Sequence, residues 1–122
     1  MRGGDRFALG QWGEDQAARY LRAQGYAILA ARFRCQEGEI DLVAQEEGFL
    51  CFVEVKLRRN ACLAQAREFV TPAKQQKVRT AALHYLIEYP SALQPRFDVV
   101  EVYAPYGEAT KNPVIRHWKN AF

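Results

Sequence analysis

Residues 38–56 read GEIDLVAQEEGFLCFVEVK, and they give the strongest local indication of the fold. Two apolar runs, EIDLVA and FLCFVEVKL, flank a short polar segment that ends in Gly48. Apolar runs of strand length around a short polar loop with a glycine are typical of a β-hairpin. Both strands also carry charged residues among apolar ones, and the face of the strand on which each charge lies determines which charges can meet.

The alternation of side chains along a strand places the charges of the hairpin. Glu54, Lys56 and Arg58 share one face of the second strand, and Glu39 and Asp41 share one face of the first. An antiparallel pairing can therefore bring Asp41 beside Glu54 and Lys56. Burying such charges costs free energy unless they are paired or bind a metal ion.

The chemistry of these three side chains points to phosphodiester hydrolysis. Asp41 and Glu54 form a hard oxygen site of the kind that Mg²⁺ or Mn²⁺ prefers. Such an ion polarises a phosphoryl oxygen, and a neighbouring lysine can orient the attacking water. The pattern predicts Asp41 and Glu54 as metal ligands and Lys56 as the catalytic cation. An exposed ion pair between Glu54 and Lys56 explains the same triplet, and spacing alone leaves both interpretations open.

The whole chain has the composition of an ordinary globular protein. Its 122 residues are 49% hydrophobic and 25% charged, which predicts one domain over residues 1–122. The difference between 17 basic and 14 acidic residues gives a net charge of +3, which permits a nucleic-acid partner. The sequence has no apolar run of about 20 residues, no secretory signal and no paired spacing among its three cysteines. We therefore expect a cytoplasmic protein with reduced thiols and no membrane partner.

The hydrophobic pattern predicts further elements on both sides of the hairpin. Two helices are expected, over residues 6–24 and 72–89. Three further strands are expected, over residues 26–33, 96–104 and 114–118. Thr71 and Pro72 have the residue types of a helix N-cap and first helical position, and residues 58–70 are assigned to a loop. The order α-β-β-β-α-β-β predicts an α/β fold with a mixed sheet flanked by helices.

Residues 38–43, GEIDLV, and residues 52–56, FVEVK, resemble the motif of the PD-(D/E)XK nucleases. More narrowly, the chain resembles the small bacterial YraN-type proteins, which are predicted endonucleases related to archaeal Holliday-junction resolvases. The resemblance runs almost end to end. The matching segments outside the hairpin are GE at 13–14, GY at 25–26, VTP at 70–72 with Lys74, RFDVV at 96–100 and NAF at 120–122.

The resemblance implies a restriction-endonuclease-like core with its active site on the hairpin and Mg²⁺ or Mn²⁺ as cofactor. By position, it makes Asp41 and Glu54 metal ligands and Lys56 the catalytic lysine. Glu14 corresponds to the first-helix acid that resolvase-like members add to the site, although a plain surface glutamate fits the sequence as well. Glu39 is interpreted as a supporting residue or ion-pair partner. The resemblance also implies DNA as partner, and a homodimer by analogy with relatives that cut two strands symmetrically.

Basic residues near the hairpin are expected to contact a nucleic-acid backbone, with a solvated basic surface as the alternative. They are Arg34, Arg58, Arg59 and Lys74. Contacts of this kind give affinity without reading bases. The chain departs from the family pattern at Arg32, where an asparagine is usual, and near Ala64, where a glycine is usual. The family resemblance is therefore weakest as a guide to the role of residues 59–68.

The two histidines carry no prediction of catalysis or metal binding. His84 and His117 have no second histidine or carboxylate at metal-ligand spacing along the chain. We therefore expect His84 at the surface or in packing.

Two functions remain open at the level of sequence. The leading hypothesis is a metal-dependent endonuclease that hydrolyses DNA phosphodiester bonds at branched or damaged structures. The alternative is a non-catalytic nucleic-acid-binding or adaptor module that retains the nuclease fold. The presence of Asp41, Glu54 and Lys56 favours the enzyme, whereas the modest net charge argues against very tight DNA binding.

Overall fold

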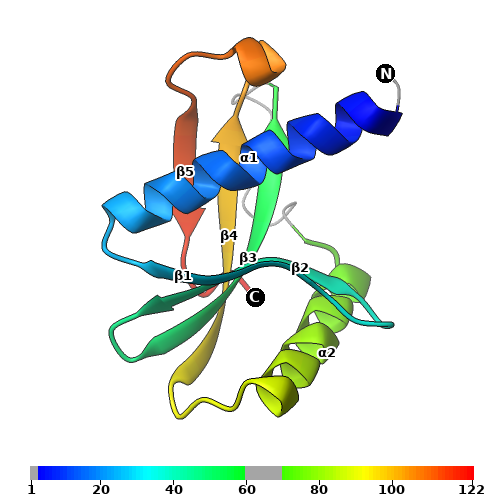
Figure 1. The fold of residues 1–122 in the computed structure, drawn as a ribbon, viewed down its shortest axis with the longest axis vertical. Coiled ribbons are helices and arrows are strands. Elements are labelled where there is room, and N and C mark those ends of the chain that lie inside the picture. Colours follow the sequence, from blue (N-terminus) through cyan, green and yellow to red (C-terminus); the bar gives the residue numbers. More distant parts are fainter. Residues whose placement is uncertain (1–2, 60–69) are drawn as a thin grey trace.

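The fold is a five-stranded sheet with a helix on each face (Figure 1). It is seen in a computed structural model that describes residues 3–59 and 70–122. The elements are α1 (Gly3–Ala23), β1 (Ala27–Arg34), β2 (Glu39–Glu46), β3 (Phe49–Arg58), α2 (Pro72–Glu88), β4 (Gln94–Tyr103), the 3₁₀ helix η3 (Gly107–Ala109) and β5 (Val114–Trp118). The predicted order α-β-β-β-α-β-β is confirmed, as is the α/β restriction-endonuclease-like class. Within the described ranges, neither α1 nor α2 combines the length and apolar character of a membrane span.

The sheet is mixed, as the sequence predicts. Its strand order follows the chain, β1-β2-β3-β4-β5. The pairs β1–β2, β2–β3 and β4–β5 are antiparallel, and β3 and β4 are parallel. Parallel neighbours need a crossover connection, and α2 lies in the connection between β3 and β4.

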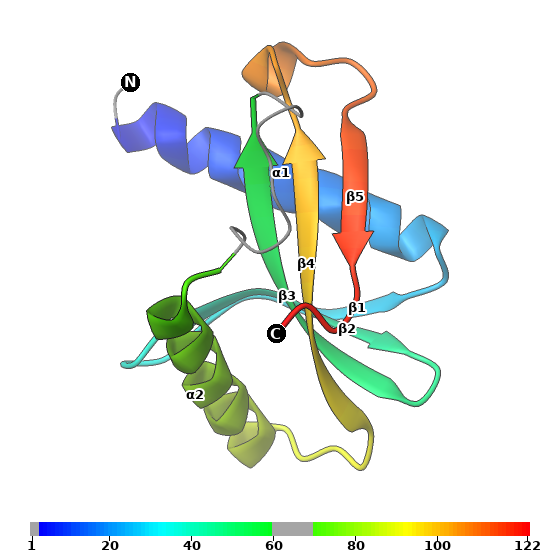
Figure 2. The same ribbon diagram turned by 180° about the vertical axis from the view of Figure 1, so that it is seen from behind.

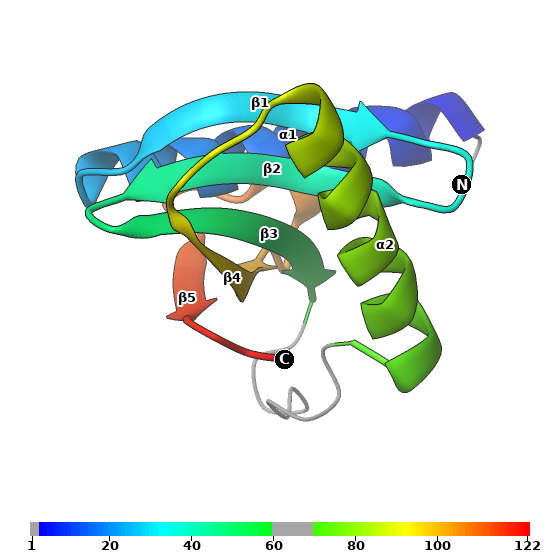
Figure 3. The ribbon, with the colours of Figure 1, turned by 90° about the horizontal axis from the view of Figure 1, so that it is seen from below.

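The helices cover opposite faces of the sheet and divide the core into two layers. Helix α1 crosses in front of β3, β4 and β5 in Figure 1 and lies behind them in Figure 2. Seen from below, α2 is on the near side of β1–β3 and α1 is on the far side (Figure 3). The α1 layer includes Leu21, Leu42, Val53 and Val100. The α2 layer includes Ile40, Val43, Phe52, Val78 and Tyr85.

Local sequence signals set the helix ends. The hydroxyl of Thr71 accepts a hydrogen bond from the main-chain N–H of Lys74 at 3.2 Å, so Thr71 is the N-cap that the sequence predicts. Helix α2 ends at Glu88, two residues before Pro90. Helix α1 ends before Gly25, whose φ of 96° favours glycine. Most of the predicted loop over residues 58–70, including Ala64, lies outside the described residues.

A buried polar network joins β4 to the end of β2 and to β5. The guanidinium of Arg96 donates two hydrogen bonds to Asp98, at 2.9 and 2.8 Å, and one to Glu46 at 2.8 Å. Nε2 of His117 lies 2.8 Å from Oδ2 of Asp98. No carboxylate lies at metal-ligand spacing from His117 along the chain, but the pairing of β4 with β5 brings the distant Asp98 to it. The pairing satisfies a carboxylate that is fully buried.

Candidate active site

Asp41 lies where the two strands of the hairpin separate. The pairing between β2 and β3 ends with Leu42 and Val53, while β3 continues beside β4 as far as Arg58. Beyond this last pair, Oδ2 of Asp41 accepts a hydrogen bond from the main-chain N–H of Val55 at 2.8 Å. The carboxylate takes the place of a strand carbonyl, so Asp41 is held at the fork between β2 and β3.

The alternation of side chains on β1 and β2 breaks beside this fork. Ile40 and Val43 are three residues apart, yet both pack in the α2 layer. Arg32 lies on β1 between the residues that pair with Leu42 and Ile40, and its φ is 56°. A positive φ is uncommon for residues other than glycine, and asparagine adopts it more readily than arginine does. The break lets the carboxylates of Glu39 and Asp41 both reach α1.

Three carboxylates form an acid cluster at this point: Glu14 of α1 and Glu39 and Asp41 of β2. Each contributes an oxygen that lies within 4.8 Å of the other two. Glu14 follows Gly13, where a Cβ atom would lie only 2.9 Å from a Leu57 methyl carbon, so the absent side chain lets α1 approach β3 closely. From the sequence, Glu39 is expected to be a supporting residue or ion-pair partner, and the strand face that it shares with Asp41 is the signal for a place in the cluster.

The electrostatics of the cluster favour a proton or a cation. Burial, the negative charge of Glu54 and the charges of Glu14 and Glu39 raise the pKa of Asp41 to about 7, against the opposing effect of the Val55 N–H. A carboxyl group shifted this far is typical of a functional site.

Glu54 lies on the face of β3 that packs toward α2, close enough to Asp41 for its charge to raise the pKa of that carboxyl. Its side chain is only 6% exposed, and Lys74 Nζ lies 3.5 Å from its Oε1. Its Oε2 is buried and has no hydrogen-bond donor among the described residues. Burial raises the pKa of Glu54, while the charges of Lys74 and Lys56 oppose the rise. Glu54 thus has one oxygen beside a lysine and one oxygen still to be satisfied.

The predicted basic residues lie in different settings. Lys56 follows Glu54 on the same strand face and is half-buried. Arg58 pairs with the buried Glu101 at 3.2 Å, and Arg34 pairs with Glu39 at 3.2 Å. Arg59 is exposed, and Lys74 is the cation beside Glu54. The structure therefore places Lys56 and Lys74 at the fork and turns Arg58 toward β4. Their contacts with nucleic acid remain predictions.

The donor atoms at the fork fit a hard divalent cation. The acid cluster and Glu54 supply only carboxylate oxygens, which are the ligands of Mg²⁺ and Mn²⁺. Burial and the negative charges of Glu54, Glu14 and Glu39 raise the pKa of Asp41, and such an ion would stabilise its charged form. The unsatisfied Oε2 of Glu54 is a further oxygen available to a ligand.

Comparison with known proteins places the chain among bacterial relatives of matching length. The family described as "Uncharacterised protein family UPF0102" matches residues 13–102, which span the acid cluster, Glu54 and Lys56. A UPF0102 protein of Syntrophotalea carbinolica is 45% identical over 118 residues, covering 96% of this chain and 93% of its own length. A UPF0102 protein of Nocardia farcinica is 44% identical, covering 98% and 92%. The resemblance to the YraN-type proteins is thus confirmed, and the chain belongs to the UPF0102 family.

Proposed function

We propose that the chain is a metal-dependent endonuclease that hydrolyses DNA phosphodiester bonds. The observation that carries this proposal is the convergence of Glu14, Glu39 and Asp41 where β2 and β3 separate. Three acidic side chains held this close repel one another. Burial and the charges of Glu54, Glu14 and Glu39 raise the pKa of Asp41, even though Arg32 pairs with Glu14 and Arg34 with Glu39. A cation would turn this repulsion into binding energy.

Asp41 and Glu54 are the proposed ligands of a Mg²⁺ or Mn²⁺ ion. Glu14 and Glu39 would add negative charge around this ion. The ion, when bound, polarises a phosphoryl oxygen and activates water for attack on phosphorus. Asp41 is kept in place by the Val55 N–H, and Glu54 by Lys74. Both carboxylates are therefore held in position before an ion binds.

Lys56 is the proposed catalytic cation. It lies on the same face of β3 as Glu54, and its charge acts on that carboxylate. An ammonium group here would hold the attacking water or a phosphate oxygen and stabilise the negative charge that grows on the phosphoryl group. Lysine can both donate hydrogen bonds and supply charge, whereas methionine, an apolar side chain of similar length, does neither.

DNA is the proposed substrate, at branched or damaged structures. Arg34, Arg58, Arg59 and Lys74 are the proposed contacts to its backbone. Among the three that form an ion pair in the structure, Arg34 is the most accessible to DNA, because its side chain is 64% exposed. A phosphate could replace Glu39 as its partner in this ion pair. A homodimer, with one site for each strand, belongs to the same proposal and rests on analogy with the resolvases.

A cleavage assay with matched variants tests the proposal. Wild type, Asp41→Asn and Lys56→Met would be incubated with Mg²⁺ or Mn²⁺ and duplex, single-stranded, flap and four-way-junction DNA. We expect cleavage by the wild type and its loss in both variants. Glu47→Gln is the control, because it removes an exposed carboxylate at the far end of the same hairpin.

The other outcomes separate the enzyme from its alternative. Equal cleavage by wild type and Asp41→Asn would contradict the proposal and indicate a contaminating nuclease. DNA binding without cleavage under either ion, unchanged or strengthened in Asp41→Asn, would instead favour a non-catalytic nucleic-acid-binding or adaptor module.

A further inference from the structure

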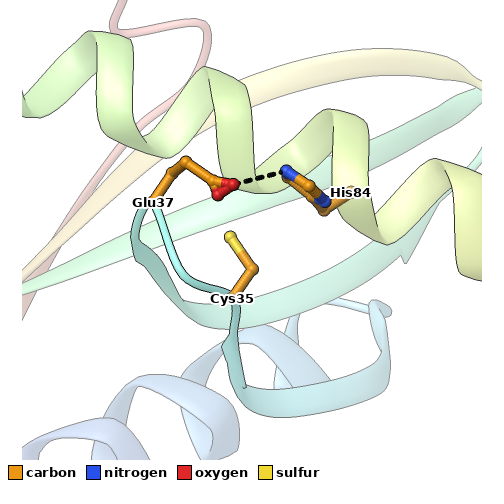
Figure 4. A group of neighbouring side chains, drawn as sticks. All are labelled: Cys35, Glu37 and His84. Carbon is orange, nitrogen blue, oxygen red and sulfur yellow. Dashed lines mark ion pairs between the residues drawn. The ribbon is translucent and has the colours of Figure 1, made fainter.

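A second group of metal-ligand side chains lies between the β1–β2 turn and α2, and it includes no member of the acid cluster (Figure 4). Cys35 and Glu37 belong to the turn, and His84 belongs to α2. The thiol sulfur, a carboxylate oxygen and an imidazole nitrogen all lie within 4.8 Å of one another. Nε2 of His84 is 2.9 Å from Oε1 of Glu37. His84 is exposed, as expected, and packing of the turn on α2 brings it the carboxylate of Glu37, which spacing along the chain does not reveal.

The backbone holds the turn against α2 independently of these three side chains. The turn is closed by hydrogen bonds from Cys35 N to Gly38 O, at 2.9 Å, and from Gly38 N to Cys35 O, at 3.3 Å. A Cβ atom at Gly38 would lie 3.0 Å from the main-chain oxygen of Lys77, so the turn packs directly on the helix backbone. The rings of Phe33 and Tyr85 meet edge to face at 5.2 Å between centroids. The three ligand atoms are thus brought together by a rigid frame.

The spacing of the three atoms suits a zinc ion. Bond lengths of about 2.0–2.3 Å to nitrogen, oxygen and sulfur place the ligands of a tetrahedral zinc about 3.3–3.8 Å apart. Side-chain rotations that move each atom by about 1 Å would reach this geometry from the observed spacing. The side chains of His84 and Glu37 are 45% and 40% exposed, so an ion can enter from solvent and a water can complete the coordination.

The chemistry of the ligands distinguishes this group from the acid cluster. Thiolate and imidazole favour zinc and related transition metals, whereas Mg²⁺ requires oxygen ligands. An exposed ion pair between His84 and Glu37 contributes little to stability by itself. The sulfur of Cys35, which points toward this pair, supplies a third ligand of the type that zinc binds most strongly (Figure 4).

We propose that Cys35, Glu37 and His84 bind a zinc ion, with water in the fourth position. The bound ion would join the β1–β2 turn to α2. Glu39 begins the strand that follows this turn, and Lys74 lies in the first turn of α2, so zinc would fix two elements that line the fork. The proposal does not depend on nuclease activity, since it concerns binding at a separate set of side chains.

Cobalt(II) is the probe for this site, because a bond between cobalt and a thiolate gives an intense near-ultraviolet charge-transfer absorption. Full-length protein would be titrated with Co²⁺ in excess Mg²⁺ and then with Zn²⁺ as competitor. We expect this absorption with the wild type, its displacement by zinc, and its loss in Cys35→Ser. Glu37→Gln and His84→Gln should weaken zinc binding by at least about tenfold.

Two controls locate the ion. Cys62→Ser changes a cysteine outside the described residues, and Asp41→Asn changes the acid cluster; both should keep the absorption. Circular dichroism of each variant establishes that it is folded, and the exposed position of Glu37 and His84 makes their variants the safer test. A wild type without thiolate-to-cobalt absorption, or a folded Cys35→Ser variant that retains it, would overturn the proposal, whatever the outcome of the cleavage assay.

Discussion

Nε of Arg32 lies 2.6 Å from Oε1 of Glu14, and Arg32 reaches that carboxylate from a left-handed backbone conformation with φ of 56°. The pair ties β1 to α1 beside Asp41. An asparagine at this position would suit the backbone, but it is too short and neutral to act as arginine does. In this chain, one residue therefore accepts backbone strain and supplies a cation next to the acid cluster.

Substitutions of Arg32 separate the backbone effect from the charge effect. Arg32→Asn and Arg32→Val both remove the cation, but a β-branched valine tolerates positive φ poorly. We expect Arg32→Val to lower the free energy of unfolding by about 1 kcal/mol more than Arg32→Asn does. Urea denaturation of the two variants measures this difference. Equal free energies of unfolding for the two variants would mean that residue 32 does not require a positive φ.

The raised pKa of Asp41 predicts how stability depends on pH. Since this pKa is about 7 in the folded chain against an ordinary value of 3.8, the folded state holds a proton that the unfolded state has lost. The contribution to stability is therefore full below pH 4 and is lost as pH rises toward 7. Without divalent ions, Asp41→Asn should stabilise the chain at pH 8, by on the order of 2 kcal/mol, and have little effect at pH 4. Denaturation of both proteins at the two pH values checks this.

Cation binding at the acid cluster should release a proton. An ion beside Asp41 stabilises its charged form, so the group loses the proton that it partly holds at pH 7. Calorimetric titration with Mn²⁺ in buffers of different ionisation enthalpy measures the protons released. We expect release of about half a proton at pH 7 and almost none at pH 9. The release should vanish in Asp41→Asn and persist in Glu47→Gln.

Lys74 should stabilise the chain only while Glu54 is ionised. Lys74→Met retains much of the apolar stem and removes the charge 3.5 Å from Glu54. The variant should be less stable by about 1 kcal/mol at pH 8, because it leaves a buried carboxylate without this cation. The loss should disappear at pH 4, where Glu54 is protonated because its pKa lies above its ordinary 4.5. Lys77→Met, on the exposed side of the same helix, is the control and should be nearly neutral at both values.

The regular elements were predictable because their signals are local. Thr71 and Pro72 mark the start of α2 without reference to the rest of the chain, and the last strand, Val114–Trp118, has the predicted bounds. The hairpin charges were also predictable, since period-2 alternation puts Glu54 and Lys56 on one face. The resemblance added Glu14, which its helix pattern alone did not distinguish from a surface glutamate.

The missed features depend on irregular backbone and on packing between distant segments. No residue type near Arg32 signals that alternation on β1 and β2 breaks there, and this break turns the face shared by Glu39 and Asp41 toward α1. The approach of Glu37 to His84 depends on how closely a turn packs on a helix, which chain spacing does not encode. The alternation of side chains predicts which residues share a face of a strand, but it does not predict where an irregular backbone interrupts that alternation.

The sheet's strand order has a consequence for folding during synthesis. Because neighbours in the sheet follow the chain from β1 to β5, the β1–β2–β3 meander involves short loops and can form before the later strands emerge. Glu14 of α1 and the meander residues Glu39, Asp41 and Glu54 are all translated before Lys74. In the nascent chain, these acidic side chains would thus come together before Lys74, which pairs with Glu54, has been synthesised. Protons or free divalent ions in the surroundings would lower the cost of this folding step, so the ionic environment acts on the protein before its chain is finished.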